Sequence, residues 1–379
     1  MIEIRPVTTK KDVKAFAKYP LELYKDCPYY VPSILADELN IFDEKKNLSL
    51  DGNEIKGFLA YKDGVLVGRI AALINDNENS KGDEKYIRFS RFECIDDLEV
   101  FKALLGAVEK LGKERGFNVI HGPWGFTDQD REGLLTYGFD KRSTYVTNYY
   151  YEYFNKNLTE LGFEDESKWI EYNFEIPKKP IERFVTFAER VKKKYNFKDI
   201  ADELSLRQII KDYGHKLFDT LDESYGHLDG YVPLSDKMRK NLLSQFSLVI
   251  NKRYISILVD ENDEVAAFGI CFPSICEAMI KSRGRLFPFA FIDVLKAVKK
   301  PKELEMALIG VKKKYKNLGL NSLVITRIIA NIIEDGIEVV ESNPMLETNL
   351  AIQQQWKFVN TEIIKKRQTY KKEIGSLIQ

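Results

Sequence analysis

The sequence predicts an α/β protein of the α+β kind, built from two successive copies of one domain. Each copy is expected to hold a mixed, mainly antiparallel sheet flanked by helices. The 379 residues are about two to three times the length of a usual single domain. A short segment recurs 201 residues later. Strand-like and helix-like apolar patterns then follow in the same order in both halves.

The repeated segment is a tyrosine that precedes a Tyr-Val-Pro triplet by six positions. It occurs at Tyr24 with residues 30–32, and again at Tyr225 with residues 231–233. Two apolar runs around an acidic turn follow each copy, which is typical of a β-hairpin. Ordered matches at nearly the same offset favour a duplicated domain.

The elements of the first half follow from apolar periods and their boundaries. Asp63-Gly64 lies between two apolar runs and indicates a tight hairpin. In the stretch 98–115, Val100, Leu104 and Val108 share one helical face, and Gly116 follows the last turn. Strands are expected at 2–6, 58–61, 65–74, 86–95, 119–121 and 169–176, and helices at 11–25, 98–115 and 149–161.

The second half repeats this order and adds a helix-rich stretch at 275–300. Pro177 and Pro180 mark the linker, so the domains are expected at 1–178 and 179–379. Strands are expected at 197–200, 254–259, 265–272, 304–311, 337–341 and 362–370, and helices at 206–221, 322–335 and 348–356.

Composition excludes several classes of protein. Lys+Arg and Asp+Glu both count 58, which removes the broad electrostatic reason to expect a nucleic-acid or membrane partner. The four cysteines form no Cys-x-x-Cys pair and histidines number only three, so no metal site is expected. No secretory leader and no run of about 18 apolar residues is recognised. We therefore expect a cytoplasmic monomer or homodimer.

The segment 309–322 is the most informative for chemistry, because an apolar strand runs through a short basic loop into a helix. The first amides of a helix lack intrahelical partners, and the positive end of the helix dipole lies there. Such a start can hold a pyrophosphate, and Gly319 leaves room for its approach.

This loop resembles the acyl-CoA loop of the GCN5-related N-acetyltransferase (GNAT) superfamily, V-x(4)-[QR]-x-x-G-x-[GA]. Val311, Lys316 and Gly319 take the Val, Gln/Arg and first-glycine positions, and Asn321 stands where the family has Gly or Ala. The resemblance implies acetyl-CoA or another acyl-CoA as co-substrate. The residues it implies for that ligand are Ile309, Gly310, Val311, Lys316, Asn317, Leu318, Gly319, Leu320, Asn321, Ser322, Asn343 and Asn349.

The corresponding loop of the first half, residues 95–99, is acidic and has no glycine. A pyrophosphate would be repelled there, so this copy is expected to be degenerate and to bind no CoA. The whole chain resembles the poorly characterised bacterial tandem members of the superfamily.

Amine acylation needs a group that removes a proton from the nucleophile and one that protonates the departing thiolate. Glu305, eleven residues before Lys316, resembles the base of family members, and Glu341 at the end of the next strand is a second candidate. Tyr315 is a candidate proton donor. Substrate-binding side chains are expected from the loops over the sheet: Tyr225, Tyr231, Arg283 and Arg285.

The sequence thus favours an N-acyltransferase, of the N-acetyltransferase kind, that moves an acyl group from acyl-CoA to the amine of a small molecule or peptide. The transfer would be a direct attack in a ternary complex. Two alternatives stay open. One is a catalytically weak acyl-CoA sensor or interaction protein, and the other is a Fem-like aminoacyl transferase.

Overall fold

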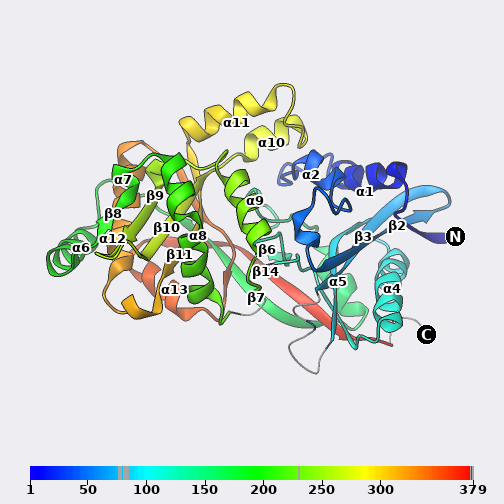
Figure 1. The fold of residues 1–379 in the computed structure, drawn as a ribbon. Helices are drawn as coiled ribbons and strands as arrows, with labels where there is room; N and C mark the ends of the chain where they lie inside the picture. The colour runs from blue at the N-terminus through cyan, green and yellow to red at the C-terminus, as the bar shows by residue number, and fades with distance from the viewer. Residues whose placement is uncertain (76–78, 80–84, 128, 229–230, 376, 378–379) are drawn as a thin grey trace.

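The computed structural model describes residues 1–75, 79, 85–127, 129–228, 231–375 and 377 (Figure 1). In the first half its strands and helices are β1 (Ile2–Pro6), α1 (Lys10–Leu23), α2 (Leu35–Leu39), β2 (Asn53–Lys62), β3 (Val65–Asn75), β4 (Tyr86–Cys94), α4 (Leu98–Glu114), β5 (Val119–Gly122), β6 (Leu134–Tyr137), α5 (Tyr153–Glu160) and β7 (Glu164–Phe174).

After a loop that contains Pro177 and Pro180, the second half begins. Its elements are α6 (Glu182–Lys194), β8 (Lys198–Asp199), α7 (Ile200–Glu203), α8 (Leu206–Tyr225), α9 (Asp236–Phe246), β9 (Ile255–Val259), β10 (Val265–Pro273), α10 (Cys276–Ser282), α11 (Ala290–Lys299), β11 (Glu303–Val311), α12 (Leu320–Glu334), β12 (Val339–Ser342), β13 (Met345–Leu346), α13 (Leu350–Gln355) and β14 (Thr361–Glu373).

The predicted fold class is confirmed, because helices flank a large, mostly antiparallel sheet. The strand order along this sheet is β1-β2-β3-β4-β5-β14-β7-β12-β11-β10-β9-β8. Among the described residues, the parallel pairs are β4 with β5 and β11 with β12. Each half therefore carries one parallel pair, at the same place in its order of elements.

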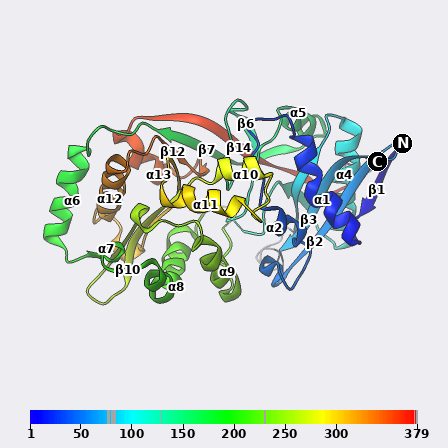
Figure 2. The same cartoon turned by 90° about the horizontal axis from the view of Figure 1, so that it is seen from above.

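The two halves exchange strands at the centre of the molecule. β14, from the end of the second half, pairs with β5 of the first half, and β7, from the first half, pairs with β12 of the second. β7 and β14 also pair antiparallel with each other along most of their length. Figures 1 and 2 show these two long strands running side by side from one half into the other.

The three largest hydrophobic clusters of the described residues pack on faces of the sheet. One lies under α4 and α5 of the first half, and includes Phe92, Phe101 and Phe154. A second lies between α12 and the sheet, and a third lies under α8 on the opposite face. The faces of β11 therefore look toward different helices, which positions the candidate site.

Several local predictions differ from the structure. The helix expected at 149–161 begins only at Tyr153, because Tyr149 and Tyr150 lie in a loop and are buried in the core. Helix α6 was not predicted. In α6 only Ala188 and Val191 are buried, so its apolar stripe is narrow.

Candidate active site

The parallel strands β11 and β12 separate halfway along β11. They pair from Glu303 to Met306 against Val339 to Ser342, and this ladder extends no further toward Val311. On the other side of β11, the register with β10 shifts at Ala307, which has no partner in the ladder. A bulge of this kind bends a strand away from its neighbour.

A cavity of about 540 Å³ opens at this separation. Its lining includes Met306 and Val324 on the α12 side of the sheet, and Leu308 and Tyr225 on the α8 side. The cavity therefore reaches both faces of the sheet through the gap between β11 and β12. A volume of this size lies in the range of ligand-binding pockets.

The cavity has an apolar arm and a polar arm. The apolar arm lies along α12 and α13, and its side chains include Val324, Ile325, Ile328, Ile329, Ile332, Val340, Ile352 and Trp356. The polar arm extends into the first half, where it is lined by Glu38, Arg69, Arg91, Glu93 and Arg131. Burial opposes ionisation of Glu38, but Arg91 and Arg69 hold its pKa down at about 2.

Two cavity residues carry buried polar atoms that meet no partner among the described residues. These atoms are Oδ1 of Asn343, after β12, and Nε1 of Trp356, at the end of α13. Buried polar atoms of proteins are nearly always hydrogen-bonded. Both residues line the cavity, but these two atoms are themselves covered by protein.

The loop after β11 has the predicted strand-to-helix geometry. Gly319 adopts a left-handed φ of 81° and directly precedes α12. A Cβ atom at this position would lie 2.3 Å from Cε1 of Phe187 on α6, so the glycine also allows the close approach of that helix. Asn317 is left-handed as well, with φ 66°.

Part of the positive charge of this loop is already paired. Lys312 and Lys314 contact Glu264, at 3.4 and 2.7 Å. The Lys313 backbone amide donates to Oε1 of Glu223 at 2.6 Å. Lys316, which takes the Gln/Arg position of the motif, forms no ion pair with the described residues.

The last turn of α8 covers polar backbone groups of β11. Ser224 Oγ donates to the Val311 carbonyl at 3.1 Å, and the Tyr225 hydroxyl donates to the Ile309 carbonyl at 3.0 Å. The same hydroxyl accepts from the Ile309 amide at 3.4 Å. Together with Glu223, these side chains form hydrogen bonds with backbone groups at the end of β11 and at the start of the following loop.

Glu305 lies on β11 with only 4% of its surface exposed. Its Oε1 accepts from Ser274 Oγ at 2.9 Å and from the Tyr145 amide at 3.3 Å, and lies 3.3 Å from the Cys276 Sγ. Burial raises the pKa of Glu305, and these donors only partly offset the effect. The polar contacts fall on Oε1, whereas Oε2 accepts none of them.

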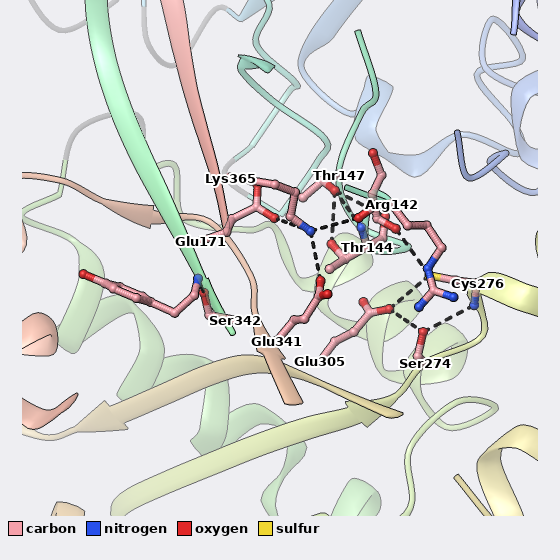
Figure 3. Close-up of polar contacts among 12 residues, drawn as sticks. Arg142, Thr144, Thr147, Glu171, Ser274, Cys276, Glu305, Glu341, Ser342 and Lys365 are labelled. Atoms are coloured by element: carbon pink, nitrogen blue, oxygen red, sulfur yellow. Dashed lines mark hydrogen bonds and ion pairs between the residues drawn. The ribbon is translucent and has the colours of Figure 1, made fainter. Parts of the chain in front are cut away.

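Glu341 faces the same side of the sheet, because it is the register partner of Glu305 across the parallel ladder. Its Oε2 accepts from Nζ of the buried Lys365 on β14 at 2.9 Å. Lys365 also contacts Glu171 on β7 at 3.1 Å, and Glu171 pairs with Arg367. Figure 3 shows Lys365 between Glu171 and Glu341, with Glu305 beside Glu341.

The predicted residues fall into two groups, and Glu305, Glu341 and residues 310–322 are not among those that line the cavity. Tyr231, Asn343 and Asn349 line the cavity, as Tyr225 and Ile309 do. Asn349 also caps α13 by accepting from the Ile352 amide. Outside the cavity wall, Tyr315 donates to Asp260, Arg283 contacts Leu21 and Glu22, and Arg285 is exposed. Burial and Asp260 raise the pKa of Tyr315.

The matching place in the first half is filled by side chains. Phe154 and Tyr153 of α5 pack on Phe101, and Phe154 also contacts Phe92 of β4. The Tyr153 hydroxyl donates to the Cys94 carbonyl at 2.7 Å, at the end of β4. Asp97 caps α4 and pairs with Lys62. An acidic side chain thus occupies the helix start where an anion would bind.

Two kinds of feature are absent from the described residues. These residues contain no group of three or more His, Cys, Asp or Glu side chains placed to hold a metal ion. Within the same part of the chain, no helix has the length and apolarity needed to cross a bilayer.

Comparisons with known proteins bear on the fold and on the wider relationship. No protein-family model matches the chain. Protein YghO of Escherichia coli is 26% identical over 381 residues, covering 98% of this chain and 95% of that protein. A bacterial ceramide synthase of Caulobacter vibrioides is 24% identical over 321 residues, covering 83% and 81%.

Solved structures agree over nearly the whole chain. A tandem GNAT protein from the clavulanic acid biosynthesis pathway has a TM-score of 0.56 at 10% identity, with 99% of both chains covered. A GCN5-related N-acetyltransferase from Sphaerobacter thermophilus has a TM-score of 0.50 at 8% identity, with 98% and 96% covered. These likenesses confirm the predicted fold.

Proposed function

We propose that this chain, which has the fold of the GNAT superfamily, is an N-acyltransferase that takes its acyl group from acyl-CoA. The observation that carries the proposal is the cavity at the separation of β11 and β12. It joins both faces of the sheet, so a thioester bound from the α12 side can meet an amine bound from the α8 side. The structural neighbours described as N-acetyltransferases support a transferase of this general kind.

The donor would lie between α12 and α13. The amides that begin α12 and the Lys316 ammonium suit a pyrophosphate, since the start of a helix attracts anions. The degenerate first half would bind no CoA, because aromatic side chains fill its matching space.

The apolar arm supports a substrate with a long hydrocarbon chain. Ile328 and Ile332 on α12 face the cavity together with Trp356. Their lining is too apolar to hold a small polar amine, and each buried methylene contributes roughly 0.8 kcal/mol. The relative named as a ceramide synthase acts in the synthesis of an amide that carries such chains. We therefore propose that a fatty acyl group is transferred, rather than acetyl alone.

Glu305 is the proposed general base. Burial raises the pKa of Glu305 in the direction of neutral pH. A base is most effective when its pKa lies near the working pH. The deprotonated amine attacks the thioester carbonyl carbon, the C–S bond breaks, and the thiolate leaves and takes a proton. Tyr225 is the proposed proton donor, since its hydroxyl already reaches β11 at Ile309. Glu341 would act as a positioning residue, held by Lys365.

The proposal is tested by calorimetry with CoA, acetyl-CoA and palmitoyl-CoA, followed by thiol release with a panel of amines. We expect binding of CoA, tighter binding of palmitoyl-CoA, and thiol release with a long-chain amino alcohol. Absence of CoA binding would refute the proposal. Binding without release from any amine would favour the acyl-CoA sensor instead.

The place of the acyl chain is tested by Ile328→Trp, which fills the apolar arm. This variant is expected to lose turnover with palmitoyl-CoA but to retain it with a short-chain acyl-CoA. Ile333→Trp on the same helix serves as the matched control, because Ile333 is not among the lining residues. Equal activity of Ile328→Trp with long-chain and short-chain acyl-CoA would show that the acyl chain does not lie in this arm.

A further inference from the structure

The hairpin formed by α10 and α11 projects from the body of the molecule (Figures 1 and 2). Its inner side is packed, because Met279 and Val294 belong to a small buried cluster with Val31 of the first half. Its tip is fixed to the first half, where the Leu35 amide donates to the Gly284 carbonyl at 2.9 Å. The hairpin is therefore a rigid part of the fold that joins both halves.

The outer side of this hairpin exposes an unusual amount of apolar surface. Phe287 and Phe289, in the loop before α11, are 75% and 76% exposed. Phe291, Ile292 and Leu295 continue the surface along the first two turns of α11, with Leu295 at 52%. We call these five residues the apolar face. Neighbouring exposed apolar side chains mark an interaction site, whereas scattered single ones do not.

The segment that carries the apolar face is rich in positive charge. Between residues 281 and 302 the chain has seven lysines and arginines and one acidic residue, Asp293. Lys281 pairs with Asp293 at 2.9 Å and Arg283 pairs with Glu22 at 3.1 Å. The cations of this segment that form no ion pair with the described residues are Arg285, Lys296, Lys299 and Lys300.

We infer that the apolar face and its four unpaired cations dock the protein on an anionic lipid bilayer. Phenylalanine, isoleucine and leucine side chains on a short helix enter the boundary between headgroups and acyl chains, while lysines stay at the phosphates. The zero net charge of the whole sequence hides this local excess. The expectation that no membrane is bound came from that sum.

The hairpin contacts both the candidate site and a residue of the cavity wall. Cys276, the first residue of α10, contacts the candidate base Glu305. Ser33 and Ile34 line the cavity, and Ser33 also lies against Gly284 at the hairpin tip. A substrate with a hydrocarbon chain would thus be collected beside the cavity that accepts it. The docking itself does not depend on acyl transfer, so its test measures no turnover.

The experiment is sedimentation of the full chain with vesicles, made of phosphatidylcholine alone or with phosphatidylglycerol added. We expect binding to the anionic vesicles, weakened when salt rises from about 0.1 to 0.5 M. The double variant Phe287→Ser, Phe289→Ser is expected to weaken binding at least about tenfold. Val65→Ser with Tyr137→Ser removes two exposed apolar side chains elsewhere and is expected to bind as the wild type does.

The charge contribution is tested by Lys296→Gln with Lys299→Gln, which should reduce binding to anionic vesicles only. Lys110→Gln with Lys113→Gln on the exposed side of α4 is the matched control. The inference is overturned if the wild-type chain does not sediment with either vesicle, or if the phenylalanine variant binds unchanged. It is also overturned if the phenylalanines instead hold a dimer in light scattering without lipid.

Discussion

At the scale of single residues, the site depends on carboxylates placed in different surroundings. Glu305 is buried among neutral donors, and burial raises its pKa. Glu341, its register partner, has a lysine beside it. Different surroundings of this kind separate the roles of two acidic groups in one site. Glu305 is therefore expected to exchange protons, whereas Glu341 holds the Lys365 ammonium group.

Glu305→Gln should lower turnover about 100-fold or more, because the variant cannot accept a proton. In the wild type, activity should fall as the pH drops through the raised pKa of Glu305, above its ordinary value of 4.5. The measurement is a pH–rate profile of thiol release. Glu303→Gln, the same change two residues earlier on β11, should leave turnover nearly unchanged.

The folding stability of these variants separates catalysis from damage. A carboxyl whose pKa is raised by folding favours the native state less as pH rises above its unfolded pKa. Glu305→Gln removes that cost, so its unfolding temperature at pH 8 should equal or exceed that of the wild type. Inactivity combined with a lowered unfolding temperature would count against the role of base.

Lys365 provides a second test at this scale. It is fully buried and shared by Glu171 and Glu341. Lys365→Met should destabilise the fold by about 3–5 kcal/mol, because buried carboxylates would lose a partner. Lys366→Met, on the exposed side of the same strand, should change stability by less than about 0.5 kcal/mol. Urea unfolding measures both, and equal values would show that the cluster adds nothing to stability.

At the scale of elements, helix α6 constrains the loop between β11 and α12. Phe187 and Val191 lie against Gly319, and α6 packs along α12. Gly319 is therefore required by the fold even without a ligand. A loss of CoA binding on substitution of Gly319 would not by itself identify a phosphate contact.

Gly319→Ala should cost about 1–2 kcal/mol for its left-handed backbone, and more for the clash with Phe187. Gly336→Ala is the matched control, because Gly336 is also left-handed but has open space around its missing Cβ. Thermal unfolding should show the larger loss at Gly319. Adding Phe187→Ala to the Gly319→Ala variant should restore part of the lost stability. If it restores none, the packing of Phe187 against this position is not the cause of the loss.

Local patterns predicted most strands and helices but not how the strands are paired. The helical spacing of apolar residues around Val100 and Leu104 predicted α4. The turn at Asp63 predicted the hairpin of β2 and β3. β14 was expected as a strand, yet its alternation is interrupted by the buried charges Lys365 and Arg367. Their partner Glu171 lies nearly 200 residues earlier, so no local signal identifies β7 as the neighbouring strand.

The candidate site shows the same limit. The strand, loop and helix around Gly319 could be predicted because they are contiguous in sequence. The contacts of Glu305 could not, since Tyr145 and Ser274 reach it from distant segments. Glu223 at the start of the loop had no sequence signal either. Contiguous backbone features were therefore predictable, and the side chains that complete the site were not.

At the scale of the whole molecule, neither half holds a complete sheet by itself. β5 needs β14, and β12 needs β7. The cavity is likewise lined by both halves, with Arg69 and Tyr145 from the first and Tyr225 from the second. Function and folding should therefore require both halves together.

Expressed separately, residues 1–178 and 179–379 should each fail to show cooperative unfolding by circular dichroism. Each would expose the edge of a strand that is central in the native sheet. Expressed together, the two pieces should associate and elute as one complex of about 44 kDa. A stable, cooperatively unfolding 1–178 fragment would show that the exchanged strands are not needed for folding.

The central position of β14 also determines when a newly made chain can finish folding. Thr361 follows Gly122 by 239 residues, so the native neighbour of β5 is synthesised long after β5 itself. At about 5–20 residues per second, ribosomes need roughly 12–48 s for that stretch. During this time the growing chain presents an open β edge, which attracts chaperones or other nascent chains. Slow translation of the second half would prolong that exposure.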